Sequence, residues 1–182
     1  MYWRDILNVQ NVEKGFFPSS NKYGIPDIKA DKLEVKNLIP YRVDKNRNGT
    51  AHFFLDDYRF ERCWKNADSQ IEELKKYDGA LSPDFSMYTN YPQAFQLWQV
   101  YRNRWCAAYW QLHGIKVIPT VSWSTEESFK YCFLGIPKHS TVAVGTVGVL
   151  NHKESQILFM RGFEEMLQQL EPSEILIYGN KL

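Results

Sequence analysis

From Thr50 to the end of the chain, short hydrophobic runs alternate with longer segments in which apolar residues recur at helical spacing. The short runs end at polar residues and predict five strands, at residues 52–55, 79–81, 116–121, 141–149 and 174–178. The longer segments predict four helices, at residues 71–77, 92–113, 126–133 and 151–170. Strands that alternate with helices are typical of an α/β protein with a parallel sheet and right-handed crossovers.

This order of elements fits two architectures. Five βα units can form an open doubly wound sheet or an incomplete (β/α) barrel. The strands follow one another at similar spacing, and no point stands out at which the strand order reverses. The even spacing favours the barrel-like arc, and the open sheet is the alternative.

The first part of the chain lacks this regularity and contains three prolines and several turn-forming clusters. We therefore expect residues 1–49 to form an N-terminal arm or lid, and residues 50–182 to form a single α/β domain. Within the arm, residues 5–9 are compatible with a helical turn, and residues 33–39 with a short strand or helix.

The composition narrows the class of protein. Lys and Arg number 22 against 21 Asp and Glu, so no strong positive field favours nucleic acid or an anionic membrane. The three cysteines lie far apart, which matches neither zinc-ligand spacing nor a disulfide framework. No signal peptide or membrane-spanning stretch is evident, so we expect a cytoplasmic protein. Aromatic residues make up 15% of the chain, enough to fill a core and to leave rings for stacking on a base or a sugar.

Polar residues follow the predicted strands directly. The carboxyl ends of parallel strands share one edge of a sheet, so we expect these residues to line one rim. They are Asp56 and Asp57 after the first strand, Ser82, Asp84 and Ser86 after the second, Thr120, Ser122 and Trp123 after the third, Thr146 in the fourth, and Tyr178 at the end of the fifth. Arg102, in the helix predicted at residues 92–113, is expected either to clamp a rim ligand or carboxylate, or to form a structural ion pair.

Asp84 and Asp57 are the candidate catalytic residues at this rim. Paired carboxylates allow three chemistries: binding of Mg²⁺ for phosphoryl transfer, acid–base cleavage of a glycosidic bond, or hydrogen bonding to ribose while Trp123 stacks on a base. The structural alternatives are that Asp57 pairs with Arg59 or Arg62, and that Asp84 caps a turn. Metal use is left open by the sequence.

Several segments resemble one uncharacterised family. They are residues 53–61, 81–86, 101–105, 117–123, 135–137, 142–149 and 178–179. Together they are similar to the Domain of Unknown Function 4417 family, which occurs in phages and other mobile elements of bacteria, and the resemblance covers roughly residues 51–179. Gly145 departs from it, because a serine is expected there, and a ligand contact made by that serine would be weakened. The resemblance implies a mobile-element protein in a bacterial host, and no reaction.

Three functional hypotheses follow. The first is a small α/β enzyme, such as a hydrolase, that acts on a nucleotide- or sugar-containing ligand. The second is a non-catalytic protein that captures a host protein or a signalling nucleotide and so counters host defence. The third is a nucleic-acid-binding protein of mobile-element replication, which the near-neutral charge disfavours.

Overall fold

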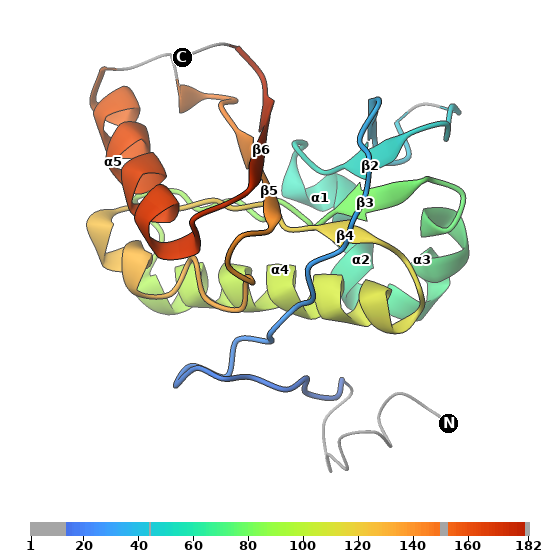
Figure 1. Cartoon of the computed structure of the whole chain (residues 1–182). Coiled ribbons are helices and arrows are strands. Elements are labelled where there is room, and N and C mark those ends of the chain that lie inside the picture. Colours follow the sequence, from blue (N-terminus) through green and yellow to red (C-terminus); the bar gives the residue numbers. More distant parts are fainter. Residues whose placement is uncertain (1–13, 44, 150–152, 181–182) are drawn as a thin grey trace.

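The chain folds into a mixed α/β structure in which all the strands run parallel; the computed structural model describes residues 14–43, 45–149 and 153–180 (Figure 1). The strands are β1 (Leu38–Pro40), β2 (Thr50–His52), β3 (Gly79–Leu81), β4 (Val117–Ile118), β5 (Thr141–Gly145) and β6 (Glu174–Tyr178). The helices are α1 (Asp57–Phe60), α2 (Arg62–Lys65), α3 (Ala67–Leu74), α4 (Gln93–Leu112), the 3₁₀ helix η2 (Glu126–Lys130) and α5 (Lys153–Leu170).

The strands follow one another in sequence order around an arc. β1, β2, β3 and β4 form one parallel sheet in that order, and β5 pairs with β6 in a second. One β-bridge, between Thr120 and Ala143, joins the two sheets. At this bridge the Val121 N–H donates to the Ala143 carbonyl at 2.8 Å, and the Ala143 N–H donates to the Pro119 carbonyl at 2.9 Å. The predicted α/β class is confirmed, and the arc does not close into a barrel.

Aromatic side chains bring β2 and the segment after it against β6, the last strand of the arc. The rings of Phe54, which follows β2, and Tyr178, at the end of β6, stack with their centroids 4.8 Å apart. His52 lies 4.5 Å from the same tyrosine ring. Gly145 faces this contact, because a Cβ atom there would lie 2.7 Å from the Phe54 ring. A serine at position 145 would collide with Phe54, so the observed position of the Phe54 ring requires glycine at position 145.

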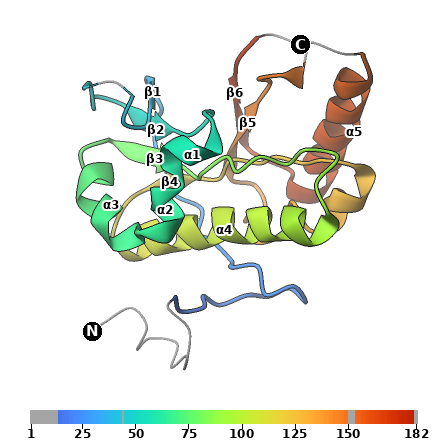
Figure 2. The same ribbon diagram turned by 180° about the vertical axis from the view of Figure 1, so that it is seen from behind.

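Helix α4 is the central support of the fold. It runs beneath the strands, while segment 14–25 lies on its other side (Figures 1 and 2). The Trp105 indole N–H donates to the Gly15 carbonyl at 2.8 Å, and Phe17 packs edge-on against the same indole. Because the helix is covered on two sides, polar and charged residues in its middle, including Arg102 and Arg104, are buried.

The predicted elements are all present, with corrected bounds. The strand expected at 52–55 begins earlier, because residues 50–52 pair with β1 and residues 53–55 turn away from the ladder. The helix expected at 71–77 begins at Ala67, and the one expected at 126–133 is a 3₁₀ helix that ends at Lys130.

Three elements went beyond the prediction. The short helices α1 and α2 were missed, because four residues are too few to show a period. β1, in the region expected as a strand or helix, pairs in parallel with β2, so part of segment 1–49 belongs to the sheet. The helical turn predicted at residues 5–9 lies outside the described residues. Across the described chain, no helix is both long and apolar enough to span a membrane.

Candidate acidic site at the strand ends

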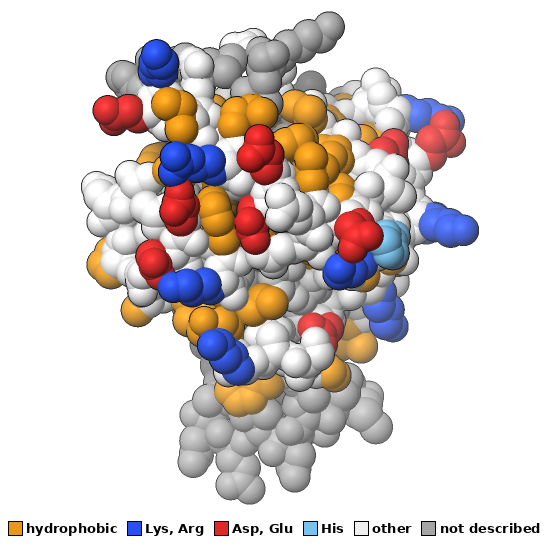
Figure 3. Space-filling model, turned by 60° about the vertical axis from the view of Figure 1, so that its left-hand side comes forward, with side chains coloured by type: hydrophobic (Ala, Val, Ile, Leu, Met, Phe, Trp, Pro, Cys, Tyr) orange, Lys and Arg blue, Asp and Glu red, His pale blue; other side chains and the backbone are white. Residues whose placement is uncertain are grey.

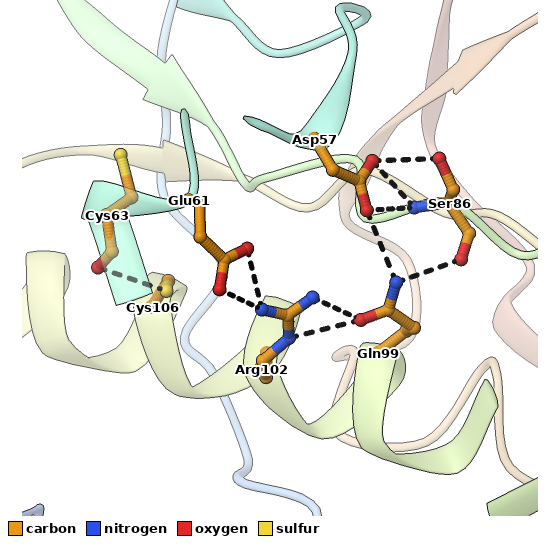
Figure 4. A network of polar contacts seen from close by, with 7 residues as sticks. All are labelled: Asp57, Glu61, Cys63, Ser86, Gln99, Arg102 and Cys106. Atoms are coloured by element: carbon orange, nitrogen blue, oxygen red, sulfur yellow. Dashed lines mark hydrogen bonds and ion pairs between the residues drawn. The ribbon is translucent and has the colours of Figure 1, made fainter. Parts of the chain in front are cut away.

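Asp57 connects the segment after β2 to the segment after β3. It is the first residue of α1, and its carboxylate accepts two hydrogen bonds from Ser86, from the backbone N–H at 3.1 Å and from the hydroxyl at 2.8 Å (Figure 4). The Gln99 side-chain amide, from α4, donates to the other carboxylate oxygen at 3.3 Å. Asp57 therefore fixes the position of the loop that carries Asp84, and it is itself fixed in orientation.

Arg102 extends this network on the side of α4 that faces α2. Its Nε donates to the Gln99 side-chain oxygen at 3.1 Å, and its guanidinium binds both oxygens of Glu61 at 2.8 and 2.9 Å (Figure 4). The guanidinium also lies 3.8 Å above the ring of Phe85. Arg102 thus forms an ion pair with Glu61 through one terminal nitrogen, which contacts both carboxylate oxygens, and direct contact with a ligand stays a prediction.

Asp84 is the most perturbed carboxyl group at the rim. It follows β3 and is partly buried. Burial, and then the negative charge of Asp57, raise the pKa of Asp84 to about 7, while a hydrogen bond from Ser122 acts in the opposite direction. A carboxyl group with a pKa near neutrality can both release and accept a proton at cellular pH, which is the property of a general acid–base catalyst.

Ser82 and Thr120 lie beneath this rim and hold two strand ends together. The Thr120 hydroxyl donates to the Ser82 carbonyl at 2.7 Å, and the Thr120 N–H donates to the Ser82 hydroxyl at 2.8 Å. Asn103 joins them from α4, because its carbonyl oxygen accepts from the Ser82 hydroxyl at 2.9 Å. Both predicted rim residues are buried in these internal contacts, and a role in ligand binding stays a prediction for each.

Trp123 is half-buried and packs against the hydrophobic cluster that contains Phe159 and Phe133. Its indole fits against Gly162 of α5, where an added Cβ would lie 2.2 Å from the indole nitrogen. The ring of Phe159 lies 5.1 Å away, and that of Phe133 lies 6.1 Å away. These contacts give the indole a packing role, and stacking on a ligand stays a prediction.

The other predicted rim residues lie at two places, Thr146 and Tyr178 together and Asp56 apart from them. Thr146 donates from its hydroxyl to the carbonyls of Tyr178, at 3.3 Å, and Asn180, at 2.9 Å, so it ties the ends of β5 and β6. Tyr178 stacks on Phe54, as described above. Asp56 is exposed and lies 3.6 Å from Arg59 in a surface ion pair. The structure thus brings the predicted residues together in pairs: Asp57 with Ser86, Asp84 with Ser122, Ser82 with Thr120, and Thr146 with Tyr178.

The structure adds an aromatic cluster that was not predicted. Tyr88 and Tyr91, in the loop that carries Asp84, pack edge to face at 5.2 Å, and Tyr91 continues the contact to Phe95 of α4 at 5.1 Å. The Gln96 amide holds this loop by donating to the Tyr91 carbonyl at 2.9 Å. Burial, and then the charge of Asp57, raise the pKa of Tyr91.

The described parts of the chain contain no cluster of side chains suited to bind a metal ion. Among residues 14–43, 45–149 and 153–180, no three His, Cys, Asp or Glu side chains gather as ligands for an ion. The three cysteines, Cys63, Cys106 and Cys132, are free and buried, as the sequence predicts. Asp57 and Asp84 supply the carboxylates at the rim, and binding of Mg²⁺ there stays a prediction.

Asp84→Asn should change how stability depends on pH. The pKa of the Asp84 carboxyl is 3.8 when unperturbed and about 7 in the fold, so between these pH values the folded state holds a proton that the unfolded state has released. Wild-type stability should therefore fall as the pH rises from 4 to 7. Relative to wild type, the Asn variant should gain about 1–3 kcal/mol at pH 8, after allowance for solvent screening, and almost nothing at pH 4.

Urea unfolding at pH 4, 6 and 8 measures this difference. Asp56→Asn is the matched control, because that carboxylate is exposed and should give no comparable pH dependence. A constant difference between wild type and Asp84→Asn across the three pH values would contradict the perturbed titration.

The fold and the site define an α/β protein with a parallel, open arc of strands and an acidic pair at their carboxyl ends. The chain belongs to the family described as a domain of unknown function (DUF4417), whose model matches residues 17–182. It is similar to the Gene 1 protein of Mycobacterium phage L5, with 42% identity over 181 residues, which cover 96% of this chain and 77% of that protein.

A second relative is the Gene 1 protein of Mycobacterium phage D29, with 40% identity over 181 residues, which cover 96% of this chain and 66% of that protein. No solved structure gives a significant match to the chain. The resemblance seen in the sequence, to an uncharacterised family found in phages, is confirmed.

Proposed function

We propose that this chain is a phage enzyme that uses Asp84 and Asp57 to hydrolyse a nucleotide- or sugar-containing ligand. Asp84 serves as the proton donor and acceptor, and Asp57 supplies the fixed negative charge. The observation that carries the proposal is the placement of two carboxyl groups in unlike surroundings. Asp57 is held by Ser86 and Gln99, whereas Asp84 is partly buried beside that charge. Such pairs divide acid and base roles in hydrolases.

The aromatic cluster supports a ligand that contains a ring. Tyr88 is 61% exposed and Phe95 is 42% exposed, so both rings present a surface to solvent, and Tyr88 lies in the loop that carries Asp84. Sugars and bases stack on such rings, and stacking is worth about 1–3 kcal/mol for each base. A non-catalytic role, the capture of a host protein or signalling nucleotide, is the alternative that the same test separates.

Turnover of a defined panel tests the proposal. The full chain would be incubated, with and without Mg²⁺, with nucleoside mono- and triphosphates, cyclic nucleotides and nitrophenyl glycosides, and product would be measured by chromatography. We expect turnover of at least one of these substrates, and a loss of about 10²–10⁴-fold in kcat for Asp84→Asn, the range typical of a general acid–base group.

Two variants make the result specific. Asp57→Asn should also reduce kcat, whereas Asp56→Asn, which removes an exposed carboxylate next in sequence, should leave it unchanged. The proposal fails if no member of the panel is turned over, or if Asp84→Asn is as active as wild type. Binding of a panel member without turnover, unchanged by Asp84→Asn, would favour the non-catalytic alternative.

A further inference from the structure

The segment that leads away from the acidic site carries no charged side chain. Residues 85–101 run from the loop after β3 into the first half of α4, and they contain no Asp, Glu, Lys, Arg or His, although 24% of the whole chain is charged. Figure 2 shows this segment crossing toward α5 and then turning into the end of α4. Charge is common elsewhere, because Figure 3 shows acidic and basic side chains scattered over the face that lies to the left in Figure 1.

Aromatic rings and amides take the place of charges on this segment. Tyr88, Phe95 and Trp98 are each at least 41% exposed, and Asn90 and Gln93 are exposed between them. Aromatic faces stack on the rings of ligands, and amides both donate and accept hydrogen bonds, as the hydroxyl groups of a sugar require. The exposed part of the segment therefore presents the side chains that recognise a neutral ring with many hydroxyl groups.

The exposed rings form one strip, which consists of Tyr88, Tyr91, Phe95 and Trp98. Contacts between Tyr88, Tyr91 and Phe95 fix its first half, as described above. In the second half, Trp98 stacks on Tyr101 at 5.6 Å. Phe95 and Trp98 are three residues apart in α4, so they share a helix face and are offset by about 4.5 Å along its axis. Rings held in this way lose little conformational freedom when a ligand binds.

The strip begins beside the residues that hold the acidic site together. Ser86 binds Asp57 through its backbone N–H and its hydroxyl, and Tyr88 follows two residues later. Gln99, one residue after Trp98, donates to the Asp57 carboxylate at 3.3 Å and to the Ser86 carbonyl at 3.1 Å. A ligand that is cleaved at the acidic pair can therefore continue along the strip.

The charges near the strip argue against a chain of phosphates. Arg102, the residue that follows the segment, is 5% exposed and bound to Glu61. The ammonium group of Lys14 lies over the rings of Trp64 and Trp105, 5.1 and 5.3 Å from their centres. Binding of nucleic acid depends on cations that contact phosphates, and the acidic pair would repel them. A chain of neutral sugars meets no such repulsion.

We propose that the strip binds a neutral oligosaccharide, several sugar units long, that extends from the acidic pair along α4. Sugar rings stack on Tyr88, Phe95 and Trp98, and the amides of Asn90 and Gln93 contact their hydroxyl groups. The inference rests on the proposed function for the position of the cleaved bond. It narrows the ligand from a nucleotide or a sugar to a neutral glycan chain.

Binding to the full chain carrying Asp84→Asn tests the proposal, because this change leaves a cleavable ligand intact. The probes are malto-, cello-, xylo- and chito-oligosaccharides of one to six units, with a single-stranded oligothymidylate for comparison, and tryptophan fluorescence and calorimetry measure the affinity. We expect at least one sugar series to bind about tenfold more tightly at six units than at two, with little change between 50 and 500 mM salt. The proposal is overturned if no series binds, or if the oligothymidylate binds more tightly than the sugars.

Variants of single rings show whether the strip is the binding surface. Phe95→Ala and Trp98→Ala should each weaken sugar binding about tenfold, whereas Trp98→Phe should retain most of it. Met160→Ala is the matched control, because Met160 lies on α5 and is 42% exposed, as Phe95 is. Thermal unfolding checks that each variant is folded. Equal affinity in all four variants would overturn the proposal.

Turnover by the wild-type chain separates this inference from the proposed function. Oligosaccharides that bind along the strip and are not cleaved would support the strip and overturn the hydrolase. Turnover of a nucleotide by a chain that binds none of the oligosaccharides would support the hydrolase and overturn the strip.

Discussion

Replacing Arg104 with methionine should lower the free energy of unfolding by about 3–5 kcal/mol, the largest effect we expect from one side chain. Arg104 is 2% exposed and donates to backbone carbonyls: Nε to Leu134 at 3.1 Å, and the two terminal nitrogens to Cys132 at 2.7 Å and Thr120 at 3.3 Å. The guanidinium thereby links α4, β4 and the segment after η2. Methionine fills similar space but removes the donor to the Leu134 and Cys132 carbonyls, while the Thr120 carbonyl keeps the hydrogen bond from the Asn103 amide at 3.3 Å.

Charge is a smaller part of this effect than hydrogen bonding. Burial lowers the pKa of Arg104 to about 10, so the side chain is still charged at pH 7, and its partners are carbonyl dipoles. Arg104→Lys should therefore also destabilise, because one ammonium cannot reproduce a planar fork of donors.

Urea denaturation measures both Arg104 variants. Arg161→Met is the matched control, since Arg161 forms an exposed ion pair with Glu126, and its loss should change stability by less than about 1 kcal/mol. An Arg104→Met variant that unfolds at the wild-type urea concentration would show that the buried guanidinium is dispensable.

Gly135→Ala should lower the free energy of unfolding more than any other glycine-to-alanine change. Two causes act there, backbone strain and a steric clash, and Gly114→Ala measures the strain alone. Both glycines have positive φ, +76° and +79°, so each alanine carries a conformational cost of about 1–2 kcal/mol. A Cβ at Gly114 meets open space, whereas at Gly135 it would lie 2.1 Å from the Pro26 carbonyl oxygen. The clash should add about 1–3 kcal/mol at Gly135.

This contact also explains how the N-terminal part is fixed to the domain. The Gly135 carbonyl accepts a hydrogen bond from the Ile28 N–H at 2.9 Å, so backbone meets backbone on both sides of the glycine. Thermal unfolding of the two variants gives the comparison. Equal losses at Gly135 and Gly114 would mean that segment 25–28 moves away without cost, and that it is not part of the cooperative unit.

Much of the fold could be predicted from the sequence, because alternating strands and helices constrain the topology strongly. The first and last residues of the strands and helices were less predictable. Residues 53–55 are as hydrophobic as a strand, but they turn into the arc, where Phe54 meets Tyr178. The pattern of hydrophobic residues reports burial, and burial alone does not distinguish a paired strand from a chain that enters the core.

The residues of the candidate site were likewise only partly predictable from the sequence. Asp57 and Asp84 were predictable, since both follow strands that end at one edge. Gln99 and Asn103 were not, because their partners are set by tertiary structure; Gln99 binds Asp57, 42 positions earlier. Polar residues in the middle of a helix are usually exposed, and only the two layers around α4 bury these.

Within the described residues, one β-bridge, between Thr120 and Ala143, joins the backbones of the two sheets. Backbone hydrogen bonds fix the register within each sheet, whereas the Phe54–Tyr178 contact on the opposite side is a stack of rings, which specifies no register. A hydrophobic cluster that includes Phe54, Ile118 and Ala143 contacts both sheets. The separation of β2 and β6 is thus set by side-chain packing, because no backbone ladder joins these two strands in the described part of the chain.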